Sequence, residues 1–353
     1  MNQHGNRNTL RVVAWETTRR CALKCRHCRG AARDQEYPGE LTTEEGFRLI
    51  DGIAAFSKPI LILTGGEPMT RTDIYDLARH ATSRGLRVAM APCGPLITAE
   101  TAAMIKDSGV MRISISIDGA TAAAHDAFRG VEGAFEAAMR GINHAKKAGL
   151  EFQINTTLTR LNVAELQAIY KLALDLGAAA FDVFFLVPTG RGSALKEMEM
   201  SPDEYEASLK WMAGLAGKAP ITVKTTCAPH FARLQAASMG GHGGGHAGGC
   251  MGGRGFVFVS HRGIAQPCGF LDLACGDIRA ENFNFKKIYE ESGIFNDLRD
   301  VDGYGGKCGL CEYRNACGGC RARAYVQSGN YLDAEPSCTY VPRALRESKE
   351  SAG

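Results

Sequence analysis

The stretch WETTRRCALKCRHCRG, residues 15–30, contains three cysteines, Cys21, Cys25 and Cys28, which are separated by three and then two residues. Cysteine thiolates are the ligands that iron–sulfur clusters take. Three thiolates on one loop can hold three of the four irons of a cubane cluster and leave the fourth iron open to chelate a small molecule. A loop of structural thiols, or a zinc site that lacks one ligand, would show the same triplet, so the rest of the chain has to decide.

Short apolar or β-branched segments alternate with amphipathic segments along the first half of the chain. We predict strands at 12–18, 59–67, 86–92, 110–118, 151–159 and 179–188, and helices that end on glycine at 74–85, 135–149 and 163–177. Such alternation is typical of βαβ units and a parallel sheet. Six strands predict an α/β fold, a partial (β/α)6 barrel open on one side to a large substrate. The cysteine triplet directly follows the first strand, at the edge where such folds place their chemistry.

The length of 353 residues exceeds one domain of about 150 residues. We therefore expect a barrel over residues 10–200 and a smaller cysteine-rich unit over 221–345. Residues 188–220 are predicted to bridge the two, with a helix starting at 201. The glycine-rich run MGGHGGGHAGGC at 239–250 is low in complexity. A hairpin is predicted at 255–268, followed by a tail with little regular structure that metal clusters would have to organise.

Ten of the thirteen cysteines form two groups, of which the triplet is the first. The second group contains Cys250, Cys268, Cys308, Cys311, Cys317, Cys320 and Cys338, while Cys93, Cys227 and Cys275 stand outside both groups. The sequence has no apolar run of 18 residues and no apolar segment of a signal peptide near its start, so we expect a cytoplasmic protein without a membrane span. Free thiols in a reducing compartment indicate metal binding rather than disulfides. The net charge of +3 gives no argument for nucleic acid.

The triplet resembles the CxxxCxxC signature of the radical S-adenosylmethionine (SAM) superfamily, which implies a 4Fe–4S cluster and SAM as cofactors. Glycines let the backbone approach a ligand closely, and a carboxylate can accept hydrogen bonds from an ammonium group. Residues that match the superfamily's SAM-binding positions are Gly65, Gly66, Glu67 and Pro68 for the methionine amino group, Ser116 and Asp118 for the ribose, and Asn155, Thr157 and Val187 for the adenosine. The third strand ends in MAPCG instead of an asparagine–glycine turn, and we expect Cys93 to be a small buried residue.

The cysteine-rich tail resembles the SPASM domain, which carries auxiliary 4Fe–4S clusters. By this resemblance, one cluster is held by Cys308, Cys311, Cys317 and Cys338. A second would be held by Cys250, Cys268 and Cys320, and it lacks one ligand. Zinc ribbons are the alternative, because paired CxxC sites are typical of tetrahedral zinc. As a hypothesis, His246 or the substrate completes the second cluster; otherwise His242 and His246 belong to a solvated glycine-rich loop.

Segments between residues 10 and 340, among them VAWETTRRCALKCRHCRGAA and CGFLDLACGDIR, are similar to the heme b synthases of the alternative, siroheme-dependent heme pathway. The resemblance implies that a 5′-deoxyadenosyl radical attacks two propionates of Fe-coproporphyrin III, which then lose carbon dioxide and an electron and become vinyls. It implies no catalytic side chain beyond the cluster ligands. An auxiliary cluster would take up the electron, and a protein such as ferredoxin or flavodoxin would be the redox partner.

A substrate with four propionates requires cations at the barrel mouth, and the planar guanidinium group of arginine suits carboxylates. The candidates are Arg129, Arg191, Arg321 and Arg323. His261 either faces the iron or occupies a turn, and we favour the turn.

Three alternative functions share much of this pattern. Related tetrapyrrole enzymes deacetylate didecarboxysiroheme or build the denitrification heme. SPASM enzymes that modify peptides frequently carry an extra amino-terminal recognition domain, and the short segment before the first strand disfavours them. The barrel pattern and the GGEP motif disfavour a protein that only transfers electrons.

Overall fold

The structure is a computed structural model that describes residues 8–195, 198–215, 217–238 and 249–350. One ten-stranded sheet forms its centre, in the order β10-β9-β8-β1-β2-β3-β4-β5-β6-β7. The strands are β1 (Val12–Thr18), β2 (Ile60–Gly65), β3 (Arg87–Met90), β4 (Val110–Ser116), β5 (Glu151–Leu158), β6 (Ala180–Phe185), β7 (Thr222–Thr226), β8 (Phe256–Val259), β9 (Ile264–Gln266) and β10 (Gly276–Asp277). All pairings from β8 through β1 to β7 are parallel, whereas β8–β9 and β9–β10 are antiparallel.

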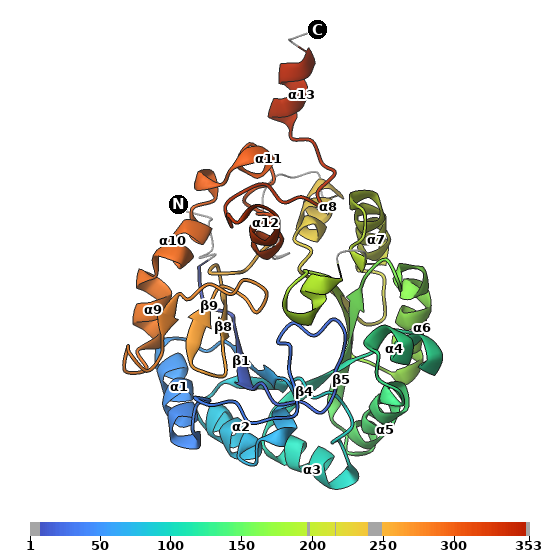
Figure 1. Cartoon of the computed structure of the whole chain (residues 1–353), viewed down its shortest axis with the longest axis vertical. Helices are drawn as coiled ribbons and strands as arrows, with labels where there is room; N and C mark the ends of the chain where they lie inside the picture. Colours follow the sequence, from blue (N-terminus) through green and yellow to red (C-terminus); the bar gives the residue numbers. More distant parts are fainter. Residues whose placement is uncertain (1–7, 196–197, 216, 239–248, 351–353) are drawn as a thin grey trace.

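The parallel strands curve into a barrel wall, and helices surround its outer side (Figure 1). These helices are α1 (Thr43–Phe56), α2 (Ile74–Ser83), α3 (Ala99–Asp107), α4 (Ala122–Arg129), α5 (Ala134–Lys147), α6 (Leu166–Leu176) and α7 (Pro202–Leu215). The α/β fold with a parallel sheet is therefore confirmed, and α2, α5, α6 and α7 lie where the sequence predicts helices.

Two strands extend the wall beyond the six that the sequence predicts. β7 pairs with β6, and its sequence TVKTT lacks the apolar alternation that would have revealed it. β8 forms the predicted hairpin with β9, but it also pairs in parallel with β1. The carboxyl-terminal part of the chain thus supplies a strand beside the one that leads into the cysteine triplet.

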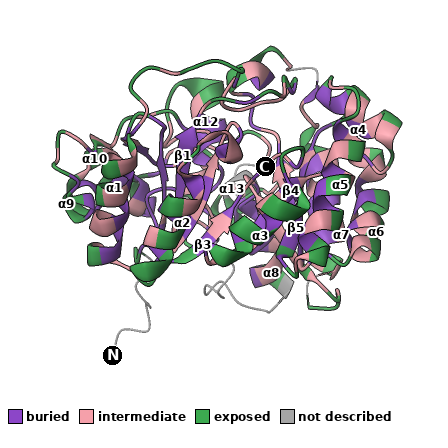
Figure 2. Cartoon of the chain, turned by 90° about the horizontal axis from the view of Figure 1, so that it is seen from below, coloured by how far each residue is buried: buried purple, intermediate pink, exposed green. Residues whose placement is uncertain are grey.

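Alternating side chains of β1 show how the sheet separates core from barrel interior. Val13 and Trp15 are fully buried in the main core, where α1 and α2 cover them. Gly46 of α1 allows this packing, because a Cβ there would lie 2.8 Å from the Trp15 ring and 2.7 Å from Leu77. Glu16 belongs to the opposite set of side chains, which faces the barrel interior. Figure 2 shows the buried residues concentrated on the strands and on the inner sides of the helices.

The tail is more regular than the sequence predicts, since it contains α9 (Phe285–Glu291), α10 (Gly293–Arg299), α11 (Gly306–Gly309), α12 (Arg321–Ser328) and α13 (Arg343–Glu350), while α8 (His230–Ser238) precedes it. Phe285, Ile288 and Phe295 bury their side chains in the main core. Apolar packing therefore organises α9 and α10, and the expectation that metal clusters alone order the tail is wrong for this part.

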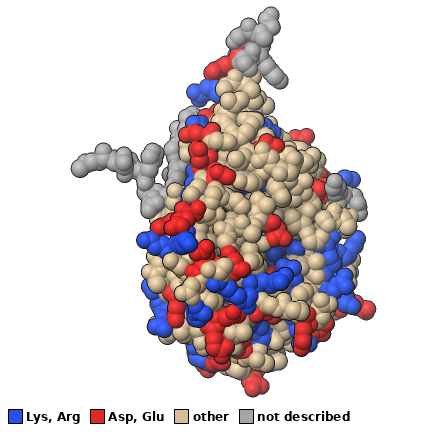
Figure 3. Space-filling view, turned by 60° about the vertical axis from the view of Figure 1, so that its left-hand side comes forward, with Lys and Arg blue, Asp and Glu red and all other residues tan. Residues whose placement is uncertain are grey.

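Charged side chains of both signs mix over the face shown in Figure 3, mostly over its lower half. This mixture agrees with the small net charge of +3. No helix within the described ranges is long and apolar enough to span a membrane.

Candidate functional site

The three cysteines of the triplet lie on the loop that follows β1, at the carboxyl edge of the barrel. Cys21 and Cys25 are buried, and Cys28 is half-buried. The segment after β6 fixes this loop: the Arg191 amide donates to the Cys28 carbonyl at 3.1 Å, and its Nε donates to the Cys25 carbonyl at 2.8 Å. A Cβ at Gly190 would lie 2.0 Å from the Arg29 carbonyl oxygen. The loop is thus held in one conformation, and its three thiols are the donor set that a three-thiolate cluster needs.

A buried ion pair lies directly behind Cys25. Arg129 donates from Nη1 to the Cys25 sulfur at 3.6 Å and from Nε to Asp118 at 2.8 Å. The other Asp118 oxygen accepts from the Thr157 amide at 2.7 Å. Burial alone would raise the pKa of Asp118, but the charge of Arg129, with help from His27, keeps that pKa below its ordinary value. Asp118 therefore orients Arg129 toward the Cys25 sulfur, and its contact with a ribose stays a prediction.

The GGEP motif packs against the triplet loop. Cβ atoms at Gly65 and Gly66 would lie 2.1 Å from the Thr18 carbonyl oxygen and 2.4 Å from the Arg20 carbonyl oxygen. Only glycine permits these approaches, and Gly65 also has a φ of +152°. The Glu67 carboxylate accepts from the amides of Met69 at 3.0 Å and of Cys93 at 2.6 Å. The Glu67 carboxylate is engaged by these amides and orders the turn. The turn therefore offers backbone groups to a ligand.

Cys93 lies beside the triplet. Its sulfur is 3.9 Å from the Cys21 sulfur and 3.6 Å from the Gly66 carbonyl oxygen. Together with Cys21 and Glu67 it lines a cavity of about 340 Å³. Cys93 is half-buried, so the expectation of a simple buried residue is wrong. No sequence signal marks this contact, because Cys93 belongs to no spaced motif.

Ser116, predicted to contact the ribose, and the predicted adenosine walls Asn155, Thr157 and Val187 separate into two places. Ser116 and Asn155 are register partners on β4 and β5, and Thr157 follows two residues later on the same face. Ile115 and Ile154 on the opposite face belong to the main core, so the polar trio faces the barrel interior. Val187 does not join them. It is 2% exposed and packs with Leu271, Cys320 and Ala322.

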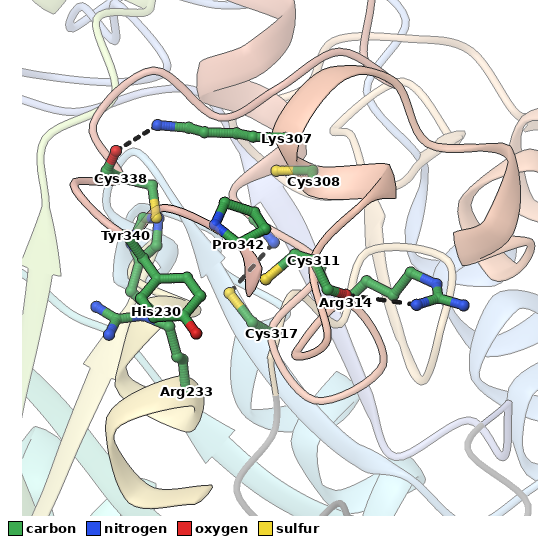
Figure 4. A pocket seen from close by; sticks show the side chains of 12 residues that line it. His230, Arg233, Lys307, Cys308, Cys311, Arg314, Cys317, Cys338, Tyr340 and Pro342 are labelled. Carbon is green, nitrogen blue, oxygen red and sulfur yellow. Dashed lines mark hydrogen bonds between the residues drawn. The ribbon is translucent and has the colours of Figure 1, made fainter. Parts of the chain in front are cut away.

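Cys308, Cys311, Cys317 and Cys338 line one pocket, and Figure 4 shows their sulfur atoms around it. Two backbone amides donate to these sulfurs: Glu335 to Cys308 at 3.3 Å and Gly319 to Cys317 at 3.4 Å. Amide donors favour the thiolate form of a cysteine. The four-thiol set predicted for the first auxiliary cluster is therefore brought together, with donor chemistry that fits an anionic cluster.

Cationic side chains surround this pocket. Arg321 donates to the Cys308 sulfur at 3.5 Å, and Arg233, Lys307 and His230 also line the pocket. Burial lowers the pKa of His230, but the adjacent carboxylate of Glu335, 2.5 Å away, raises it to about 9. His230 was missed in the sequence because it lies 78 residues before its neighbour Cys308, outside any cysteine motif. The positive charges of these side chains suit an anionic cluster in the pocket.

The other three tail cysteines gather at the apolar cluster around Val187. Cys320 is one of its buried members, and Cys268 packs against it. Cys250 lies near Cys320. The Cys250 amide donates to the Cys317 carbonyl at 2.8 Å, which joins this set to the four-thiol pocket. In the described part of the chain, no three Cys, His, Asp or Glu side chains converge as ligands of a single metal ion do.

The guanidinium groups of the four predicted substrate arginines bind protein acceptors. Arg129 and Arg191 hold the triplet loop, as described above. Arg321 donates to the carbonyls of Tyr331 and Asp333 at 3.1 and 2.7 Å, and Arg323 pairs with Glu335 at 2.9 Å. Their role as substrate ligands stays a prediction.

Two of the three histidines considered from the sequence, His242 and His246, lie outside the described residues. His261 lies in the turn between β8 and β9, and its Nδ1 is 2.7 Å from Glu16.

The amino-acid sequence matches the family model of the radical SAM superfamily over residues 15–173. It is 48% identical to an AdoMet-dependent heme synthase of Oleidesulfovibrio alaskensis, over 94% of this chain and 88% of the relative. It is 47% identical to an AdoMet-dependent heme synthase of Methanosarcina barkeri, over 95% of this chain and 98% of the relative. An Fe-coproporphyrin III synthase of the same archaeon is 29% identical, over 93% of this chain and 87% of the relative.

Solved structures share the fold. SuiB of Streptococcus suis bound to S-adenosylmethionine superposes with a TM-score of 0.72 at 15% identity, over 94% of this chain and 78% of that one. Native anSMEcpe with bound AdoMet gives a TM-score of 0.69 at 17% identity, over 92% and 93% of the two chains. Both neighbours are SPASM-type radical SAM enzymes. The chain is therefore an enzyme that uses a 4Fe–4S cluster and SAM, and it belongs to the radical SAM superfamily, in the family of the AdoMet-dependent heme synthases.

Proposed function

We propose that this enzyme converts Fe-coproporphyrin III to heme b by oxidative decarboxylation of two propionates. The observation that carries the proposal is the 48% identity, over 94% of the chain, to an AdoMet-dependent heme synthase. The Fe-coproporphyrin III synthase is more distant, at 29% identity. The name of that relative makes Fe-coproporphyrin III its product. The more similar relatives are named heme synthases, which favours Fe-coproporphyrin III as the substrate of this enzyme.

The reaction balances for each propionate. One hydrogen atom leaves the carbon attached to the ring, one carbon dioxide leaves, and one electron leaves, so that a vinyl group remains. The 4Fe–4S cluster with SAM supplies the radical that removes the hydrogen. The protein has to hold the triplet loop in place, exclude water and provide an exit for the electron. Gly190, Arg191 and Arg129 serve the first task through their contacts with the triplet loop.

Two auxiliary 4Fe–4S clusters provide the electron exit in this proposal. The four-thiol pocket of Cys308, Cys311, Cys317 and Cys338 holds one of them, and the set around Cys320 holds the other. Arg29, which follows Cys28, donates to the carbonyl of Gly269 at 3.1 Å, and Gly269 follows Cys268. The second set therefore lies beside the triplet loop. The hydrogen bond from the Cys250 amide to the Cys317 carbonyl connects this set to the four-thiol pocket.

In this proposal, a redox protein such as ferredoxin or flavodoxin takes the electron from that pocket, where Cys308, Cys311 and Cys338 are half-buried. Thiol ligands stay free in a reducing compartment, which supports a cytoplasmic location.

The test is an anaerobic incubation of reconstituted enzyme with SAM, a strong reductant and Fe-coproporphyrin III, followed by mass spectrometry of the tetrapyrrole. We expect a mono-vinyl intermediate and then heme b, with 5′-deoxyadenosine formed in parallel. The Cys25→Ala variant should give neither product. Formation of 5′-deoxyadenosine from wild type with unchanged Fe-coproporphyrin III, and turnover of didecarboxysiroheme instead, would reject the proposal.

A further inference from the structure

Cys227, which belongs to no cysteine motif, lies at the second auxiliary site. It directly follows β7, at the carboxyl edge of the barrel. Its side chain packs against the apolar cluster that contains the buried Cys320. Cys227 and Cys268 both pack against the apolar cluster whose buried members are Val187, Leu271, Cys320 and Ala322. The fold thus brings a fourth thiol to a site that the sequence leaves one ligand short.

Cys227, Cys268 and Cys320 belong to one packed cluster, and Cys250 lies near Cys268 and Cys320. Four thiolates are the full complement of a 4Fe–4S cluster. We propose that Cys227 is the fourth ligand of the second auxiliary cluster, together with Cys250, Cys268 and Cys320.

The backbone of Cys227 supports this role. Its φ is +59°, a left-handed conformation that is sterically unfavourable for a residue with a Cβ. Two buried donors hold it there, since the Cys227 carbonyl accepts from Arg323 Nη2 at 3.1 Å and from the Tyr205 hydroxyl at 3.1 Å. Arg323 is itself fixed by the Leu186 carbonyl at 3.2 Å and by Glu335. Strain that a surrounding network enforces is typical of functional positions, and here it presents a thiol to Cys320.

A cluster with four cysteine ligands has no open iron. Neither the substrate nor His246 would then complete it, and its task would be electron transfer. The apolar side chains of Val187, Leu271 and Ala322 beside it exclude water from this region. The inference rests on the auxiliary-cluster part of the proposed function, but its test needs no porphyrin.

The test uses the full chain in which Cys21, Cys25 and Cys28 are replaced by alanine, so that only auxiliary clusters bind. We expect about eight irons per chain and no [3Fe–4S] electron paramagnetic resonance signal after mild oxidation, because no iron is labile. Cys227→Gly suits the positive φ and removes the thiol, so it should fold, as checked by circular dichroism, and should give a [3Fe–4S] signal. Cys227→Ser should keep four irons in that cluster with shifted g values in the reduced state.

Cys275→Ser is the matched control, since Cys275 is a half-buried cysteine that packs against the main core; its spectra should equal those of the parent. Parent-like iron content and spectra in both Cys227 variants would overturn the inference and leave the auxiliary clusters standing. If Cys227→Gly does not fold, the g values of Cys227→Ser decide alone. Zinc, or no iron, in the parent would overturn both this inference and the auxiliary-cluster proposal.

Discussion

Arg29 donates a hydrogen bond of 3.1 Å to the carbonyl of Gly269, and the two residues directly follow Cys28 and Cys268, which are predicted to bind clusters. The same guanidinium donates to Glu16 at 2.9 Å and stacks over the Phe258 ring at 4.5 Å. Glu16 is completely buried; burial would raise its pKa, but His261, Arg29 and Arg19 keep that pKa below its ordinary value. Arg29 therefore connects the triplet loop, the first barrel strand and the cysteine-rich tail.

Arg29→Ala should destabilise the protein, because it removes one of the positive charges that stabilise the buried Glu16 carboxylate. We expect a loss of about 2 kcal/mol, since Arg19 and His261 still partner Glu16. Thermal unfolding in the absence of iron measures this loss without a contribution from the clusters. Arg26→Ala, an exposed arginine on the same loop, is the control and should leave the melting temperature unchanged. Equal melting temperatures for the two variants would contradict the prediction.

Gly190→Ala should prevent correct placement of the radical loop. The added Cβ would lie 2.0 Å from the Arg29 carbonyl oxygen and 2.6 Å from that of Cys28, and Gly190 has a φ of +58°. We expect loss of the SAM-dependent change in the spectrum of the reduced cluster and at least a hundredfold slower SAM cleavage, since a 1 Å misplacement can cost roughly that factor.

The control for that variant is Gly214→Ala in α7, where a Cβ would meet no atom within 4 Å. It should keep full activity and gain up to about 1 kcal/mol of stability from helix propensity. Normal SAM cleavage by Gly190→Ala would show that the loop tolerates the shift.

Arg129→Met should damage both stability and the cluster. It leaves Asp118, which is completely buried, with only neutral hydrogen-bond partners and the nearby His27. Breaking a buried pair in this way costs about 3–5 kcal/mol. Arg129→Lys keeps the charge but cannot bridge Asp118 and the Cys25 sulfur with two separate nitrogens, so we expect it to recover stability and still to shift the reduction potential of the radical cluster. A potential equal to that of wild type in Arg129→Lys would exclude a role for the Cys25 contact.

Glu45 gives a pH-dependent contribution to stability. Its hydrogen bonds from Arg279, aided by the Thr42 amide and opposed by burial, lower its pKa from 4.5 to about 2. Because the folded pKa is the lower one, the stabilisation is complete above pH 4.5 and is lost as the pH falls toward 2. Solvent screening limits it to about 1 kcal/mol.

The stability difference between wild type and Glu45→Gln should therefore shrink as the pH is lowered from neutrality to about 4. Glu44→Gln, an exposed neighbour in the same helical turn, should show no such trend. A difference that stays constant with pH would mean that the ionised carboxylate is not the stabilising form.

The parts that the sequence predicts correctly have local signals. Apolar alternation identifies β1–β6, and fixed spacings identify the triplet and the cysteines of the four-thiol pocket. The missed parts depend on contacts between distant segments. β7 has the sequence TVKTT and is specified by its pairing with β6, not by an apolar pattern. Cys227 has no neighbour in sequence that marks it, and only the end of β7 brings it to Cys320. Arg129 was expected to meet a substrate, because its partner Asp118 is recognisable only once α4 packs on the barrel.

The pairing of β8 with β1 has a consequence for synthesis of the chain. Val12–Trp15 and Phe256–Val259 are neighbours in the sheet although more than 240 residues separate them. On the ribosome, β1 has an unpaired edge until β8 emerges, and such edges invite wrong pairings. The loop of Cys21, Cys25 and Cys28 also lacks its Arg29–Gly269 anchor until then. Iron delivered to this loop before release of the nascent chain would meet a barrel wall that still lacks β8. We therefore expect cluster insertion to follow translation.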